Sequence, residues 1–188
     1  FALPPIGSVT GPLTGCAGGT GSYTVPLVAG ATTYTWTVPA GTTITSGQGT
    51  NTINVTYGAT SGNICVTATS ACDSEGPTCL AITLSAIPIV NDPADQAVCE
   101  GGNTTAVNFT GTGGPTYDWT NNNTATGLAA SGTGNIASFV GTNTTALPIV
   151  STVTVTPTSG CAGSPQTFTI TVNPVPTIGA GLDQAVCA

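Results

Sequence analysis

A proline and a cysteine recur in this chain at a fixed spacing of eleven residues, and this recurrence constrains the fold more than any other feature. The three pairs are Pro5 with Cys16, Pro88 with Cys99, and Pro176 with Cys187. The pentapeptide Asp-Gln-Ala-Val-Cys also occurs twice, at 95–99 and at 183–187. Because self-similarity at a fixed period is the signature of tandem repeats, we expect the chain to consist of small structural units of one type.

The repeats match along most of their length. In both, a tryptophan lies twenty residues after the first cysteine and two residues after a tyrosine, and a Thr-rich segment leads to a second cysteine. The sequence therefore predicts one repeat at 1–88, a second at 89–176, and a linker with the first strand of a third, incomplete repeat at 177–188. The shared positions are Cys16, Tyr34, Trp36 and Cys72 in the first repeat, and Cys99, Tyr117, Trp119 and Cys161 in the second.

Apolar residues alternate with Thr and Asn between turns that are rich in Gly and Pro. Alternation with a period of two indicates strands with one buried face, and no stretch shows a helical period. About seven short strands per repeat, with a central tryptophan between two cysteines, predict tandem all-β antiparallel β-sandwiches. The shared tyrosines and tryptophans are expected in the core, with each tryptophan packed against a disulfide; platforms for stacking sugars are the alternative. Expected strands include 34–38, 52–57, 64–68, 80–84, 152–155 and 167–172, and 131–134 is expected to be a turn.

Composition excludes most of the chemistry that a chain of this length could perform. There is no Lys, Arg or His, and the formal net charge is −7. Such a chain cannot neutralise nucleic-acid phosphates or dock on an anionic membrane, and it lacks the usual general bases. The carboxylates of the candidate acid/base pairs lie in turns, without long loops to wall a cleft, so we predict no enzyme activity and no cofactor. No apolar run reaches about 20 residues, so no membrane insertion is expected.

The seven cysteines indicate disulfides and an oxidising compartment outside the cytoplasm. The repeat frame favours one bridge between the two shared cysteines of each repeat. Two further cysteines flank Cys72 symmetrically and would face each other across a hairpin. Other pairings stay open because four cysteines allow three pairings, and a zinc site from the cysteines of the first repeat lacks both Cys-x-x-Cys spacing and His. The predicted bridges are Cys16–Cys72, Cys99–Cys161 and Cys65–Cys79, with Cys187 unpaired in this chain.

Asp92, Asp95 and Glu100 lie near the junction of the two predicted repeats. Carboxylate oxygens are ligands that suit calcium, so an ion that stiffens the linker is one interpretation. No loop has the dense acidic spacing of a calcium motif, however. The favoured interpretation is therefore solvated or turn-capping carboxylates, with no bound metal.

Several short motifs are shared with a known type of repeat. Segment 8–72 contains Cys16-Ala17-Gly18 and Tyr34-Thr35-Trp36-Thr37-Val38-Pro39, and segment 91–176 contains Trp119-Thr120-Asn121 and Asn173-Pro174. With these motifs the first segment resembles the PKD-like immunoglobulin-type repeats of giant secreted surface proteins of Bacteroidota. The second is similar to the sister repeat found in tandem in gliding-motility adhesins of that group. The resemblance implies Ig-like sandwiches, export by the type IX secretion system, and display on the bacterial cell surface as an adhesin or filament.

These observations together predict a non-catalytic structural segment, a stalk or spacer, of an extracellular adhesin or filament. Its expected partners are neighbouring repeats of the same protein, with surface glycans or proteins and self-association as further candidates. One alternative is a polymerising filament subunit, in which a strand of one chain completes the sheet of the next. The other is a glycan- or protein-binding module of a secreted multidomain protein, which an exposed aromatic patch without a core role would favour.

Overall fold

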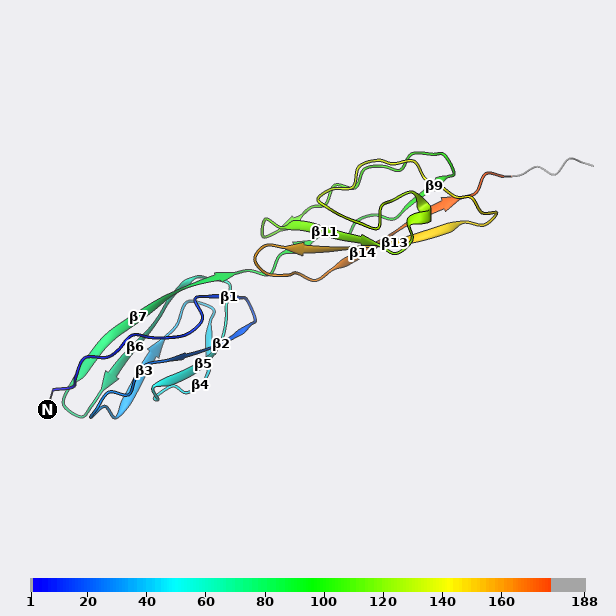
Figure 1. Ribbon diagram of the computed structural model, residues 1–188. Coiled ribbons are helices and arrows are strands. Elements are labelled where there is room, and N and C mark those ends of the chain that lie inside the picture. Colours follow the sequence, from blue (N-terminus) through cyan, green and yellow to red (C-terminus); the bar gives the residue numbers. More distant parts are fainter. Residues whose placement is uncertain (1, 177–188) are drawn as a thin grey trace, which may run out of the picture. The chain divides into compact units, whose positions relative to one another are not determined.

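The computed structural model describes residues 2–176, which form two all-β units (Figure 1). Among these residues, unit 1 comprises the chain up to Ile89 together with Gly111–Pro115 and Thr158–Gly163, and unit 2 comprises Val90–Thr110, Thr116–Pro157 and the chain from Ser164 onward. The repeat boundary between residues 88 and 89 stays a prediction. The predicted third repeat at 177–188, with Cys187, lies outside the described residues. Within the described range, no helix is long and apolar enough to cross a membrane.

Unit 1 is a sandwich of two sheets. One sheet has the strand order β1-β7-β6-β3 and the other has the order β2-β5-β4. The first and last strands, β1 and β7, are paired in parallel, whereas the β2–β5, β4–β5, β3–β6 and β6–β7 pairs are antiparallel. The strands are β1 (Thr14–Cys16), β2 (Thr20–Thr24), β3 (Thr33–Thr37), β4 (Thr43–Ser46), β5 (Thr52–Thr56), β6 (Gly62–Thr69) and β7 (Ser74–Ser85).

The core of unit 1 follows from the alternation in its strands. In β6, Ile64, Val66 and Ala68 are fully buried, and the residues between them are only partly covered. Successive side chains of a strand point to opposite faces, so these three face the other sheet. There they join Ile53 and Val55 of β5 in one apolar cluster. The Thr residues on the outer face provide the solvent-facing surface of a chain that has almost no charge.

Unit 2 has one regular sheet with the strand order β12-β11-β13-β14-β9. Its first strand β9 again pairs in parallel with the last strand β14. The elements are β9 (Gln96–Cys99), β11 (Thr116–Asn121), the 3-10 helix η1 (Thr124–Thr126), β12 (Ser131–Thr133), β13 (Ile149–Thr158) and β14 (Gln166–Asn173). The short strands β8 (Ile89–Val90) and β10 (Gly111–Thr112) pair with each other, and Ile89 and β10 are counted in unit 1.

The second layer of unit 2 consists of extended segments held by single bridges, Asn103 to Val140 and Val107 to Ile136. Side chains replace part of the missing ladder: the backbone N–H of Phe109 donates to Asn135 Oδ1 at 3.0 Å. Asn, Ser and Thr side chains compete with backbone pairing in this way. The layer is still apolar inside, because Val107, Phe109 and Ile136 join the cluster with Val153 and Phe168.

The segment 131–134 is where the predicted turn differs from the structure, since Ser131–Thr133 is strand β12. Gly132 pairs directly with Trp119 of β11. A Cβ on Gly132 would lie 2.3 Å from Trp119 Cζ2, so the glycine leaves room for the indole to lie over the strand. Glycine is here a packing requirement of the sheet and not a turn signal.

Candidate functional site

The Cys65–Cys79 bridge is present, as the sequence predicts, and joins β6 to β7. The two residues are direct partners in the antiparallel register, with their Cα atoms 4.0 Å apart. Cys65 lies between Ile64 and Val66, which are buried in the core, so its side chain is on the outer face of the sheet. The bridge is therefore a staple across the hairpin and not a core element.

The second bridge joins Cys16 to Cys161, with a Cα–Cα distance of 5.9 Å and a sequence separation of 145 residues. Cys161 lies in the Thr158–Gly163 segment, which belongs to unit 1. The predicted pairings Cys16–Cys72 and Cys99–Cys161 are therefore wrong. The two bonded cysteines are still both shared positions of the repeat frame, but they come from different sequence repeats.

Strand length explains why the predicted pairing fails in unit 1. Cys16 is the register partner of Ser85 at the end of β7, whereas Cys72 lies in the turn before Ser74, where β7 begins. A strand rises about 3.3 Å per residue, so the two cysteines are separated by about 36 Å along β7. A disulfide requires Cα atoms within about 7 Å.

The same geometry applies in unit 2. Cys99 is the register partner of Asn173 at the end of β14, and Cys161 precedes Gln166, where β14 begins. The rise of about 3.3 Å per residue puts them about 23 Å or more apart. Each repeat therefore has one shared cysteine at each end of its last strand.

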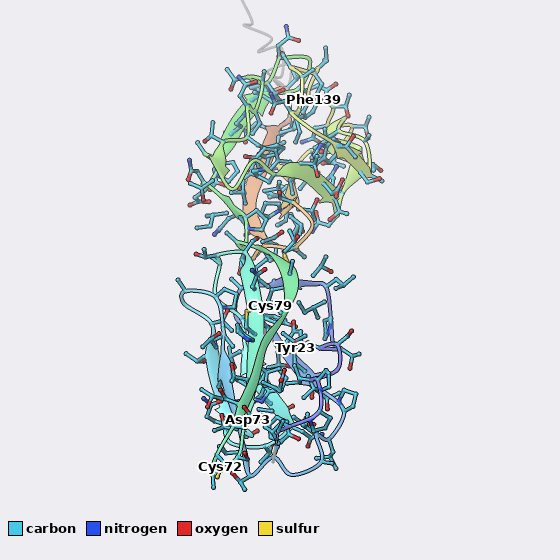
Figure 2. The ribbon with its side chains drawn as sticks, turned by 90° about the vertical axis from the view of Figure 1, so that its left-hand side faces the viewer. Tyr23, Cys72, Asp73, Cys79 and Phe139 are labelled. Atoms are coloured by element: carbon cyan, nitrogen blue, oxygen red, sulfur yellow. A yellow bond between two sulfur atoms is a disulfide. The ribbon has the colours of Figure 1, made fainter. Side chains whose placement is uncertain are left out.

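Cys72 and Cys99 are exposed and are not disulfide-bonded within the described chain. Figure 2 shows Cys72 at the tip of the hairpin between β6 and β7, next to Asp73. Asp73 Oδ2 accepts a hydrogen bond from the backbone N–H of Leu3 at 2.7 Å, so this carboxylate holds the N-terminal segment against the hairpin. Among residues 2–176, the predicted disulfide role of both cysteines is therefore wrong.

The four aromatic residues predicted for the core, Tyr34, Trp36, Tyr117 and Trp119, pack in the cores of the two units. Trp36, Trp119 and Tyr34 are 3%, 7% and 5% exposed, and Tyr117 is half-buried, with its ring centroid 5.4 Å from that of Phe109. Trp36 Nε1 donates to the backbone carbonyl of Thr50 at 2.8 Å, but the buried Trp119 Nε1 has no hydrogen-bond partner. The expectation that Trp36 packs against a disulfide is wrong, because the bridge in its sheet lies on the opposite face.

Tyr23 and Tyr57 form a buried hydrogen-bonded pair in unit 1 that the sequence did not single out. Their hydroxyl oxygens are 3.0 Å apart, and the Tyr23 hydroxyl also donates to the carbonyl of Pro12 at 2.9 Å. Burial, and then the hydrogen bond with Tyr57, raise the pKa of Tyr23 well above its ordinary value of 10.0. Tyr23 therefore keeps its proton at physiological pH and acts as a structural hydrogen-bonding group in the core.

Of Asp92, Asp95 and Glu100, the last two accept hydrogen bonds from backbone N–H groups. Asp95 Oδ1 accepts from the N–H of Thr169 at 2.6 Å, and Glu100 Oε2 accepts from the N–H of Asn143. Within residues 2–176, no three His, Cys, Asp or Glu side chains are grouped closely enough to hold a metal ion. Two of the three carboxylates thus act as caps, which is the interpretation that the sequence favoured.

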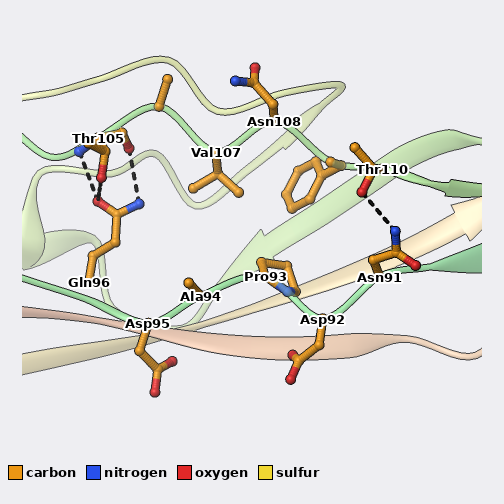
Figure 3. Close-up of a pocket in the computed structure, with 12 residues that line it drawn as sticks. Asn91, Asp92, Pro93, Ala94, Asp95, Gln96, Thr105, Val107, Asn108 and Thr110 are labelled. Atoms are coloured by element: carbon orange, nitrogen blue, oxygen red, sulfur yellow. Dashed lines mark hydrogen bonds between the residues drawn. The ribbon is translucent and has the colours of Figure 1, made fainter.

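A shallow cavity of about 340 Å³ lies in unit 2 between residues 91–96 and 105–110 (Figure 3). Gln96 closes one end, since its Nε2 donates to the carbonyl of Thr105 at 3.0 Å and its Oε1 accepts from the N–H of Thr105 at 2.9 Å. Asn91 closes the other end by donating to Thr110 Oγ1 at 2.9 Å. Asp92 and Asp95 point away from the 105–110 segment, so neither carboxylate faces the cavity. The cavity offers hydroxyl, amide and apolar groups, and no arrangement of acid and base.

Comparison with known proteins identifies one domain type. Residues 2–82 match the family model described as "PKD-like domain". No curated protein matches the chain.

Three of the solved structures that are similar to the chain are an intimin fragment, an adhesin and a tandem from titin, all at low identity. A C-terminal 282-residue fragment of intimin, solved in complex with the intimin-binding domain of the translocated intimin receptor, is 18% identical, with 92% of this chain and 65% of that chain covered and a TM-score of 0.43. The Escherichia coli adhesin FdeC is 19% identical over 92% of this chain and 66% of that chain, with a TM-score of 0.37. The I9-I11 tandem of titin is 14% identical over 93% and 66%, with a TM-score of 0.32. The chain thus spans about two thirds of the length of these structures.

The two-sheet sandwich of unit 1, the parallel pairing of first and last strands in both units, and the match of residues 2–82 agree with one another. The chain is an all-β, disulfide-bonded protein of tandem Ig-like sandwiches, and its first 82 residues contain an Ig-like domain that matches the PKD-like model.

Proposed function

We propose that the chain is a non-catalytic stalk segment of an extracellular surface protein and that it transmits tension along the polypeptide. The observation that carries this proposal is the Cys16–Cys161 bridge, which closes a loop with a sequence separation of 145 residues. Tension applied at the two ends of the chain enters at the N-terminal segment, crosses the sulfur–sulfur bond and continues along β14. Most of the residues of both units therefore lie outside the covalent path of the load.

The second bridge acts in the same direction on a smaller scale. Cys65–Cys79 ties β6 to β7 and keeps the hairpin between them closed even when the surrounding sandwich opens. Covalent cross-links of this kind limit how far a chain extends, because the enclosed residues cannot unravel until the bond is reduced. Because Cys65–Cys79 lies inside the loop closed by Cys16–Cys161, it limits extension only once the larger bridge is broken.

The use of the aromatic side chains supports a spacer over a sugar-binding module. Among residues 2–176 every Phe, Tyr and Trp is buried or half-buried, so none stands free as a stacking platform. The cavity between 91–96 and 105–110 is closed at its ends by the protein's own amide groups. The aromatic side chains and the amide groups at the ends of the cavity thus stabilise the fold, which supports a structural role.

Location outside the cytoplasm is part of the same proposal. Disulfides persist in oxidising compartments, and two are present here. The motif resemblance of both repeats and the PKD-like match of residues 2–82 support a giant secreted adhesin of the gliding-motility type as the parent protein. Export by the type IX system and display on the bacterial surface belong to this proposal.

Pulling single oxidised chains by their two ends tests the proposed function. We expect the oxidised chain to stretch only by its segments outside Cys16–Cys161, with no unfolding step from the enclosed residues. Release of the chain between Cys16 and Cys161 in oxidised, unreduced molecules, seen as an extension longer than the segments outside the bridge allow, would overturn the proposal. A screen against glycan and protein panels is the companion measurement, and saturable binding there would favour the binding-module alternative.

A further inference from the structure

Cys72 and Cys99 are the shared cysteines that have no bond within the described chain. They are also the frame counterparts of the two cysteines that are bonded to each other: Cys72 matches Cys161, and Cys99 matches Cys16. The bond in the structure thus joins a first-position cysteine to the hairpin cysteine of another repeat. The two unbonded cysteines are likewise one first-position cysteine, Cys99, and one hairpin cysteine, Cys72.

The surroundings of Cys99 reproduce those of Cys16. The carbonyl of Cys16 accepts from the N–H of Gly19 at 2.9 Å, and the carbonyl of Cys99 accepts from the N–H of Gly102 at 2.9 Å. The residue after each cysteine donates its N–H to the end of the last strand, at 2.9 Å to the carbonyl of Ser85 and at 2.8 Å to that of Asn173. Cys99 is therefore held in the same backbone setting, at the same end of its strand pair, as a cysteine that does form a bridge.

The hairpin cysteines are equivalent in the same sense. Cys72 lies in the turn between β6 and β7, and Cys161 lies in the turn between β13 and β14. Each follows a serine by two residues, and that serine donates its N–H within the turn, from Ser70 at 2.8 Å and from Ser159 at 2.9 Å. Both turns therefore present a cysteine at the tip of the long hairpin of their repeat.

A partner from the same repeat is excluded by distance, since the shared cysteines of one repeat lie at opposite ends of its last strand. We propose that Cys72 of one copy of this chain forms a disulfide with Cys99 of a second copy, which repeats between molecules the pairing of hairpin and first-position cysteines seen in Cys16–Cys161. This inference rests on the proposed stalk function and names its partner. The bond would link stalk segments of neighbouring molecules by the same chemistry as the bridge within each.

The bond forms by two thiol–disulfide exchanges with a small disulfide oxidant such as oxidised glutathione. The Cys99 thiolate attacks the oxidant to form a mixed disulfide and displaces one glutathione thiolate. The Cys72 thiolate of the second copy then attacks the Cys99 sulfur and displaces the other glutathione. The two protons released by the cysteines end on the two glutathione thiols, so one oxidant molecule is reduced for each link.

Two variants of the 188-residue chain test the pairing, both with Cys187→Ser so that the cysteine of the terminal segment takes no part. One also carries Cys72→Ser and keeps only Cys99, and the other carries Cys99→Ser and keeps only Cys72; one of them is labelled with ¹⁵N. The variants are mixed in equal amounts, oxidised with glutathione disulfide, and their dimers are weighed by mass spectrometry. The same mixture in urea is the control, where random pairing gives heterodimers as half of all dimers.

We expect the folded mixture to form mainly the Cys72–Cys99 heterodimer, well above the share found in urea. The Cys187→Ser chain with both thiols should form a ladder of multimers that a reductant collapses. Homodimers at the random share or above, or no cross-linking in the folded state, would overturn the inference. Such a result leaves the stalk proposal untouched, because that proposal is tested by pulling single chains.

Discussion

Removal of the Cys16–Cys161 bridge should release a large and calculable length of chain under tension. The bridge spans 145 residues and holds its Cα atoms 5.9 Å apart. At about 3.3–3.6 Å per extended residue, the enclosed chain has a contour length of about 480–520 Å. In the oxidised wild type this length is hidden from the load.

The second bridge divides that length into two parts. Cys65–Cys79 spans 14 residues with Cα atoms 4.0 Å apart, and at about 3.3–3.6 Å per residue it withholds about 45 Å. The Cys16→Ser chain, kept oxidised, should therefore gain about 430–470 Å of contour length when both units unfold. Addition of a reductant should add the remaining 45 Å or so.

Single-molecule force spectroscopy with handles at both ends measures these lengths. Cys72→Ser is the matched control, because it removes an exposed cysteine that has no bridge among the described residues, and it should behave as the wild type does. If the oxidised wild type and Cys16→Ser release the same contour length, the bridge does not carry the load and the reasoning fails.

Three further changes probe the cores and the hairpin. Trp36→Phe should lower the free energy of unfolding by about 1 kcal/mol more than Trp119→Phe in chemical denaturation, because only Trp36 loses an indole hydrogen bond; equal losses would contradict this. Because the pKa of Tyr23 is raised in the folded state, its contribution to stability is complete below pH 10.0 and declines as the pH rises above that value. Urea midpoints measured across this range should therefore fall more steeply in the wild type than in Tyr23→Phe. Parallel curves for the two proteins would refute this prediction. Replacing Cys65 and Cys79 together by Ser should cost about 3 kcal/mol, the chain-entropy value for a loop of about 15 residues; an unchanged denaturation midpoint would show that the staple contributes nothing.

The strands were predictable wherever alternation was strong. The expected segments 52–57, 64–68 and 167–172 fall on β5, β6 and β14, because buried Val and Ile recur there with a period of two. The second layer of unit 2 was harder to predict, since Asn135 and Thr104 supply side-chain hydrogen bonds in place of a ladder. Segment 131–134 was missed because its glycine serves the packing of an indole that is distant in sequence.

The cysteine pairing shows which disulfides can be predicted from the spacing of the repeats and which cannot. The frame correctly marks Cys16 and Cys161 as equivalent to Cys99 and Cys72, but sequence spacing does not show that β7 and β14 keep the shared cysteines of one repeat far apart. The Cys65–Cys79 bridge could be predicted from the sequence because a short hairpin fixes its own register. Local pairs can thus be inferred from spacing, whereas bridges between repeats require the strand geometry.

Non-reducing peptide mapping by mass spectrometry is the most direct test of the account as a whole. The chain has no Lys or Arg for trypsin to cut, so pepsin at acid pH, which also suppresses disulfide exchange, is the appropriate protease. The account predicts linked peptides for Cys16–Cys161 and Cys65–Cys79, with free thiols at Cys72 and Cys99 in the isolated monomer. Linked peptides for Cys16–Cys72 and Cys99–Cys161 would contradict it, because the load would then pass through the fold of each repeat.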